Sequence, residues 1–166
     1  MPNLKWLREY SGQTVEQLIS LEGEYRIDSL IVAFWQAVDQ KSAREGEGNL
    51  SEEETFIIAI EMLESEVNNG GYNLFFTNSS KEYTPVIVSA LFRIGCPRTA
   101  QITQRAIDAL HLPALTIEAI DAAMVTENGE RERVLNECDD LYYHTSEDIA
   151  GNLFAFIRAN KSAIRL

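Results

Sequence analysis

The sequence predicts an all-α fold, with about eight or nine helices in a single compact domain over residues 1–166. Three observations lead to this prediction. Apolar residues recur at the three- and four-residue spacing of a helix, capping residues precede most of these runs, and strand signals are scarce. The β-branched cluster Val86-Ile87-Val88 lies between flanks that keep the helical period. With 166 residues, of which 45% are hydrophobic, the chain is long enough to bury a sizeable core.

The first fifty residues are expected to contain two short helices and one long one. The short helices are predicted over residues 3–10 and from Thr14 to about Gly23, separated by a break at Ser11-Gly12. The long amphipathic helix is predicted over residues 24–45. Its apolar face is formed by Ile27, Leu30, Ile31, Phe34, Trp35 and Val38.

The stretch over residues 50–80 is the centre of the predicted fold. Ser51 and Glu54 have the spacing of a capping box, and the glutamates of this first turn place negative charge at the positive end of the helix dipole. The helix that follows is apolar over most of its circumference, so we expect other elements to contact it from more than one direction. Asn68-Asn69-Gly70-Gly71 is expected to end it, because Gly and Asn tolerate the left-handed conformation. An aromatic turn is predicted next, formed by Tyr72, Phe75 and Phe76.

Five further helices are predicted in the second half of the chain. Pro85 falls in the first turn of one of them, where its missing N–H costs little, and Gly95 with Pro97 marks the end of that helix. Thr145 or Ser146 is expected to cap the last helix. Val134, Cys138 and Leu141 are expected to face inward from the fourth. The predicted ranges of the first four are 82–94, 98–110, 116–126 and 130–142, and the last helix is expected to turn Ile149, Leu153, Phe156 and Ile157 towards the core.

The charge of the chain is its unusual feature. There are 26 acidic and 14 basic side chains, a net charge of −12. Residues 51–82 and 116–148 together hold 17 acidic and 3 basic side chains, a net of −14. In both segments the acids alternate with apolar residues at helical spacing, so we expect them on structured helices. The charge argues against direct binding to nucleic acid, and it is compatible either with a basic partner or with a role in solubility alone.

Several classes of protein are excluded or disfavoured by the same reading. No apolar run reaches the roughly 18 residues of a membrane span, so no membrane association is expected. The first ten residues lack the apolar core and cleavage site of a signal peptide, which makes a cytoplasmic location the expectation. Cys96 and Cys138 are too far apart in the chain to indicate a disulfide framework or a metal site.

The sequence contains no phosphate-binding glycine loop, no HExxH and no cysteine pair, so we expect no cofactor and no catalytic residue. One alternative is an enzyme or metal protein that uses Asp140 and His144, which are four residues apart and so could share a helix face and hold a metal. Thr145-Ser146 is typical of a helix cap, however, and would end the helical spacing there.

Acidic side chains on helices can imitate DNA. Carboxylates three or four residues apart lie about 5–6 Å from each other, and duplex DNA carries one negative charge per ~1.7 Å of its axis. A rigid array from several helices can therefore approximate rows of phosphates and be bound by the same Lys and Arg side chains. The candidate partner-binding residues are Glu52, Glu53, Glu54, Glu130, Glu132, Glu137, Asp139, Asp140, Glu147 and Asp148. The first three also have a capping explanation.

Residues of about 45–162 resemble a bacterial all-helical family that was first known only as a domain of unknown function and that includes a DNA mimic. The resemblance rests on a helix ending in Val67-Asn68-Asn69-Gly70-Gly71, followed by an aromatic residue, an aromatic pair and Asn78-Ser79-Ser80. Further matching segments are Ala90-Leu91-Phe92-Arg93-Ile94-Gly95, Asp139-Asp140-Leu141-Tyr142-Tyr143 and Glu147-Asp148.

The resemblance implies a non-enzymatic, dimeric protein that occupies the DNA-binding surface of a helix-turn-helix transcriptional regulator and blocks its binding to DNA. We interpret the matching residues as residues of the fold, so mimicry itself depends on the acidic segments. The alternative is an immunity or antitoxin-like protein that binds a basic toxin, because such a partner would also require an acidic surface.

Overall fold

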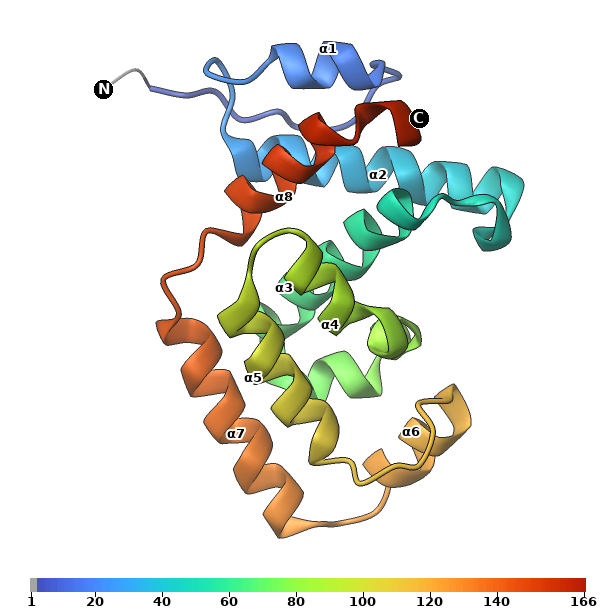
Figure 1. Ribbon diagram of the computed structural model, residues 1–166, viewed down its shortest axis with the longest axis vertical. Coiled ribbons are helices and arrows are strands. Elements are labelled where there is room, and N and C mark those ends of the chain that lie inside the picture. The colour runs from blue at the N-terminus through green and yellow to red at the C-terminus, as the bar shows by residue number, and fades with distance from the viewer. Residues whose placement is uncertain (1–2) are drawn as a thin grey trace. The chain divides into compact units, whose positions relative to one another are not determined.

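The computed structural model describes residues 3–166, and its regular structure is helical apart from two isolated β-bridges (Figure 1). The all-α prediction is confirmed, with eight α-helices and three short 3₁₀ helices in this part of the chain. The α-helices are α1 (Val15–Ser20), α2 (Ile27–Glu45), α3 (Glu52–Thr77), α4 (Thr84–Arg93), α5 (Pro97–Asp108), α6 (Ile117–Met124), α7 (Gly129–His144) and α8 (Ile149–Ala159). The 3₁₀ helices are η1 (Glu47–Asn49), η2 (Ser79–Tyr83) and η3 (Lys161–Ala163).

The helices gather into two compact units. Unit 1 comprises the chain up to residue 61 together with residues 148–166, and unit 2 comprises residues 62–147. The first part of α3 belongs to unit 1 and the remainder to unit 2. The single domain expected from the sequence stays a prediction. None of the helices in the described residues is long and apolar enough to cross a membrane.

Unit 1 is built around α2 and α8. The rings of Phe34 and Phe154 meet edge to face with centroids 6.4 Å apart, and both side chains are buried. Thr14 and Gln17 form a reciprocal capping box at the start of α1, where the sequence predicted that a helix begins. The contact between the rings of Phe34 and Phe154 adds to the free energy gained by burying them, so it helps to hold α2 and α8 together.

The helix predicted over residues 3–10 is wrong. This segment forms no helix, and the backbone of Lys5 donates to the carbonyl of Glu24 and accepts from the N–H of Arg26. An isolated helix of eight residues is marginal in water, so backbone pairing with another segment is favoured. The same pairing explains why α2 begins at Ile27, later than the predicted residue 24.

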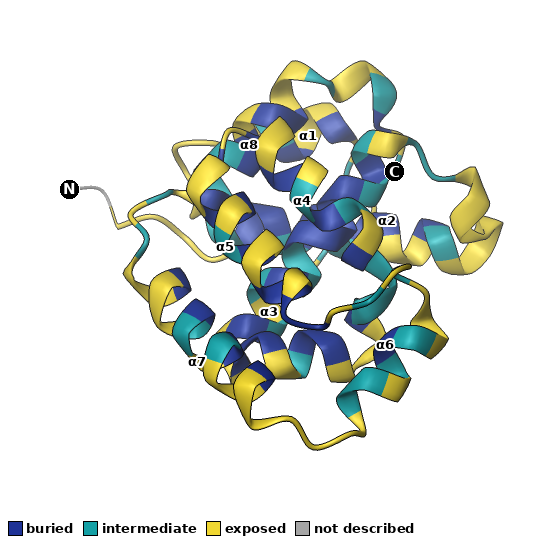
Figure 2. Ribbon diagram, turned by 60° about the horizontal axis from the view of Figure 1, so that its bottom comes forward, coloured by how far each residue is buried: buried dark blue, intermediate teal, exposed yellow. Residues whose placement is uncertain are grey.

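Unit 2 contains an aromatic core at the end of α3. Tyr72, Phe75 and Phe76 are fully buried, and the rings of Phe75 and Phe76 lie 5.4 Å apart. The hydroxyl of Tyr72 is 2.7 Å from that of Thr103 on α5, which satisfies both groups inside the core. Figure 2 shows α7 with a buried side and a long exposed side.

The predicted helix stop at the glycine pair is confirmed, but the aromatic turn is wrong. Gly70 and Gly71 leave the helical conformation, and a second helical segment then runs from Tyr72 to Thr77. The aromatic residues therefore lie on a helix. The segment can start here because Asp139 accepts a hydrogen bond of 2.7 Å from the N–H of Tyr72, as an N-cap residue would.

Two smaller expectations also change. Asp148 caps α8 through the N–H of Gly151, so neither Thr145 nor Ser146 is the cap. On α7, Cys138 is buried as predicted, but Leu141 is 46% exposed and Tyr142 takes the inward position. The inward face of α7 follows residues 135, 138 and 142, which is an equally regular helical series.

Candidate functional site

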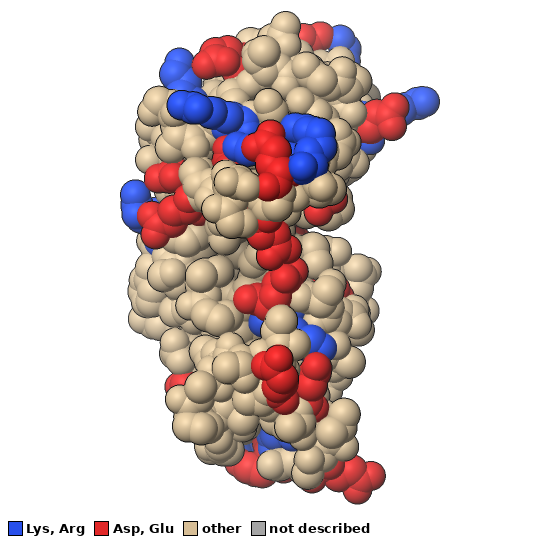
Figure 3. Space-filling model, turned by 90° about the vertical axis from the view of Figure 1, so that its right-hand side faces the viewer, with Lys and Arg blue, Asp and Glu red and all other residues tan. Residues whose placement is uncertain are grey.

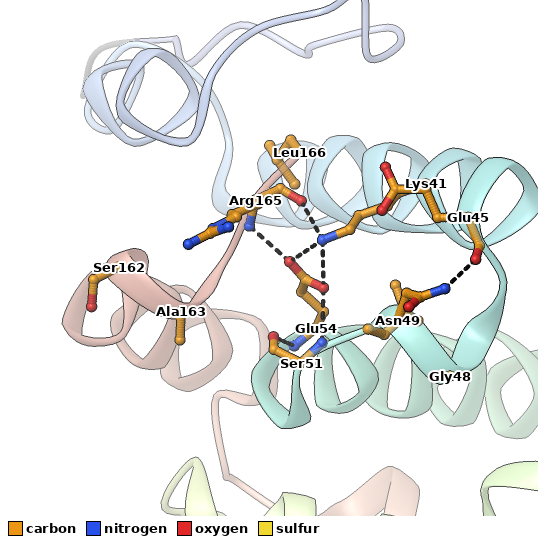
Figure 4. Close-up of a pocket in the computed structure, with 11 residues that line it drawn as sticks. Lys41, Glu45, Gly48, Asn49, Ser51, Glu54, Ser162, Ala163, Arg165 and Leu166 are labelled. Carbon is orange, nitrogen blue, oxygen red and sulfur yellow. Dashed lines mark hydrogen bonds and ion pairs between the residues drawn. The ribbon is translucent and has the colours of Figure 1, made fainter.

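Glu54 is the predicted site residue with the clearest structural role. Its carboxylate is buried and accepts hydrogen bonds of 2.8 and 2.9 Å from Lys41, 3.0 Å from the N–H of Ser51 and 2.7 Å from the N–H of Arg165 (Figure 4). Burial by itself raises the pKa of Glu54, and the bonds from Lys41, Arg165 and Ser51 outweigh it, so the pKa lies below its usual value. The capping box predicted with Ser51 is present, since Glu54 N–H also donates to the hydroxyl of Ser51. This carboxylate is fully engaged within unit 1.

Glu52 and Glu53 remain at the surface of unit 1. Both lie in the first turn of α3, where their charge complements the helix dipole. Glu52 is exposed and Glu53 is partly exposed.

Three of the other acids bind backbone N–H groups at the starts of helices. Glu147 accepts from the backbone N–H groups of Arg98 and Thr99 and from the Thr99 hydroxyl, at 2.7–2.8 Å, at the start of α5. These bonds lower the pKa of Glu147 against the effect of burial, which alone would raise it. Asp148 caps α8, and Asp139 caps the second segment of α3. Their carboxylates satisfy backbone N–H groups that would otherwise lack partners.

Glu130 and Glu137 lie in a surface ion-pair network on α7. Arg133 pairs with both of them, at spacings of three and four residues, and Arg105 of α5 pairs with Glu137. The hydrogen bond and charge of Arg133 lower the pKa of Glu130. Exposed pairs of this kind contribute little to stability, but they cancel charge locally and fix the side chains.

Arg131, the other basic residue of α7, is buried. Its guanidinium donates to the carbonyls of Ala123, at 2.6 Å, and Thr126, at 2.7 Å, at the end of α6. A cation at the C-terminal end of a helix satisfies its last carbonyls and complements its dipole. The positive charge of Arg131 is therefore used inside unit 2, and Arg133 is the one basic side chain that the described segment 116–148 presents at the surface.

Glu132 and Asp140 are the predicted acids of unit 2 that stay unengaged. Both are exposed, and within residues 3–166 neither side chain has a hydrogen bond or an ion pair. They are eight residues apart, or about 12 Å along the axis of α7. Glu118 of α6 and Glu127 before α7, which the sequence reasoning did not select, share these properties. The only feature of the sequence that could have indicated Glu118 and Glu127 was their position in the acidic segment 116–148. Figure 3 shows acidic side chains on the face of the molecule that it presents.

The alternative metal site finds little support in the geometry. Nδ1 of His144 lies 2.6 Å from the backbone oxygen of Asp140, so this ring nitrogen is engaged with the helix itself. In the described part of the chain, no group of three or more His, Cys, Asp or Glu side chains is placed to hold a metal ion.

The chain is thus an all-helical acidic protein with solvent-exposed carboxylates on α6 and α7. The family model of the DMP19-like proteins matches residues 48–160, and the chain belongs to this family. This is the DNA mimic protein 19-like family, which is the family that the resemblance in the sequence indicated. A comparison with curated proteins gives no match.

Proposed function

We propose that the chain is an acidic DNA mimic that binds the DNA-binding surface of a helix-turn-helix transcriptional regulator and blocks its binding to DNA. The observation that carries the proposal is membership of the DNA mimic family, which implies a DNA-binding protein as the partner. In this proposal the chain acts in the cytoplasm as a non-enzymatic homodimer and binds neither nucleic acid nor a membrane.

The charge of unit 2 supports this proposal. It holds 13 acidic and 6 basic side chains, a net of −7. Several of the six bases are already engaged, Lys81 with Asp121 and Arg131 with backbone carbonyls. Free carboxylates on a rigid helix meet a basic surface without the entropy cost of ordering a flexible tail.

We choose the residues of the proposed partner surface by the exposure and the hydrogen bonds of each acidic side chain. We assign the free acids Glu132 and Asp140 and the paired acids Glu130 and Glu137, and we add Glu118 and Glu127. Glu52 and Glu53 form a second patch on unit 1. We leave out four acids of the sequence-based set because they cap helices or lie in the core, namely Glu54, Asp139, Glu147 and Asp148.

A pull-down from the source cell tests the proposal. The wild-type chain should recover DNA-binding proteins. The double variant Glu132→Lys/Asp140→Lys should lose them, because each substitution places a repelling cation where the partner is basic. The matched control is Asp39→Lys/Glu47→Lys, which makes the same change of net charge at two exposed acids of unit 1. Equal loss in both variants, or recovery of proteins that bind no DNA, would contradict the proposal.

A further inference from the structure

Two side chains from a single turn of α7 form hydrogen bonds with the backbone on either side of the break in α3. The hydroxyl of Tyr143 donates to the carbonyl of Val67, at the end of the first segment, and Asp139 accepts from the N–H of Tyr72, at the start of the second. Tyr143 and Asp139 are four residues apart and therefore share one face of α7. Side chains of α7 thus bind the last turn of the first α3 segment and the first residue of the second.

This arrangement leaves a small solvent-exposed surface at the break. Asn68, Asn69 and Gly70 are exposed at the break. Tyr143 is 50% exposed although its hydroxyl is anchored, so its ring is held in place while part of it faces solvent. The neighbouring Asp140 has an unengaged carboxylate, because His144 contacts only its backbone oxygen. We call these five residues, 68–70, 140 and 143, the break surface.

The parts of α3 and α7 that form the break surface contain no basic residue. No Lys or Arg occurs between Arg44 and Lys81, or between Arg133 and Arg158. The last turn of the first α3 segment adds the negative end of a helix dipole. The pKa of the Tyr143 hydroxyl is raised by burial and then by the charges of Asp139 and Asp140. A cation is the complementary occupant.

We propose that the break surface receives one arginine side chain of the partner, whose guanidinium stacks on the ring of Tyr143 and pairs with Asp140. Arginine fits better than lysine, because its planar guanidinium both stacks on an aromatic face and donates two parallel hydrogen bonds to a carboxylate. Anchored tyrosines and arginines are also the residue types that concentrate binding energy at protein interfaces. This inference rests on the proposed function and names the contact within it.

Titration of the ¹⁵N-labelled chain with hexa-arginine and hexa-lysine peptides tests the inference. Hexa-arginine should shift the amide signals of Asn69, Gly70 and Tyr143 and bind about two- to fivefold more tightly than hexa-lysine, the gain expected from an exposed cation–π contact. Tyr143→Phe should keep this preference, since the aromatic face remains, and Tyr143→Leu should abolish it. Equal affinity for the two peptides, or an unchanged preference in Tyr143→Leu, would overturn the inference.

The contribution of the carboxylate is tested with a matched pair of variants. Asp140→Asn should weaken hexa-arginine binding several-fold more than Glu132→Gln, which removes an equally exposed and unengaged charge from the same helix. Equal weakening would mean that the peptide responds only to overall charge, and the arginine contact would be rejected. That result would leave the proposed function standing, because recovery of DNA-binding proteins in the pull-down is a separate measurement.

Discussion

At the scale of single residues, Gly71 shows how a local conformation decides which side chain is allowed. Its φ is +74°, and a Cβ at this position would lie 2.1 Å from a carboxylate oxygen of Asp139. Glycine alone combines this φ with so close an approach at low cost. Without it, Asp139 could not reach the N–H of Tyr72.

We therefore expect Gly71→Ala to lower the free energy of unfolding by about 2–3 kcal/mol, from backbone strain together with the displaced cap. Urea denaturation followed by circular dichroism measures the change. Gly48→Ala is the control, because a Cβ there meets no atom within 4 Å and φ is not positive. Equal losses in the two variants would show that the break does not require glycine.

Glu61 is a second residue with a measurable consequence. Burial, together with the nearby charge of Asp28, raises the pKa of Glu61 to about 7. The folded state then binds its proton more tightly than the unfolded state. Stability is therefore highest below the unfolded pKa of 4.5 and is lost as the pH rises from there through about 7.

Glu61→Gln should remove this loss and stabilise the chain by on the order of 2 kcal/mol at pH 8. Denaturant unfolding at pH 5 and at pH 8 checks the prediction, with the exposed Glu16→Gln as a control. The account of Glu61 would be refuted by a stability difference between variant and wild type that is the same at both pH values.

At the scale of elements, the buried pair of Lys41 and Glu54 joins α2 to the start of α3 and to the segment after η3. The N–H of Arg165 donates to Glu54, and its carbonyl accepts from Lys41 at 3.1 Å. Both backbone groups of this residue are thus satisfied by one ion pair. Removing a single partner would leave an uncompensated charge in the interior.

Lys41→Met should accordingly destabilise the chain by about 3–5 kcal/mol, and the double variant Lys41→Met/Glu54→Leu should recover a large part of that loss. Thermal unfolding of both variants and the wild type provides the comparison. A double variant less stable than Lys41→Met would contradict this view of the pair.

Most of the helices could be predicted because their signals are local. The Ser51–Glu54 capping box, Pro85 in a first turn and the inward Cys138 each depend on neighbours within one or two turns. The remaining features depend on partners distant in sequence. The pairing of residues 3–10 with the start of α2, and the cap that Asp139 supplies from 67 residues away, leave no local signal.

For the candidate site, the sequence indicated the acidic segments but not the role of each carboxylate. Composition identified the acidic segments, but it could not separate free carboxylates from those that act as caps. Glu147 and Asp140 look alike in the sequence, and only the packing of α5 against α7 turns Glu147 towards backbone N–H groups.

At the scale of the whole molecule, the net charge of −12 governs association. Two such chains repel each other at long range, so the proposed homodimer needs an interface with few free charges. Sedimentation equilibrium should give twice the monomer mass, with a dissociation constant that falls as salt screens the repulsion. A monomer mass at all salt concentrations would contradict the dimer.

Displacement of DNA from a regulator recovered in the pull-down tests the central claim most directly. Fluorescence polarisation of the regulator's labelled operator should fall to the value of free DNA as the wild-type chain is added. Glu132→Lys/Asp140→Lys should displace none. If the operator stays bound while the chain binds the same regulator, the chain does not occupy the DNA-binding surface and is not a DNA mimic.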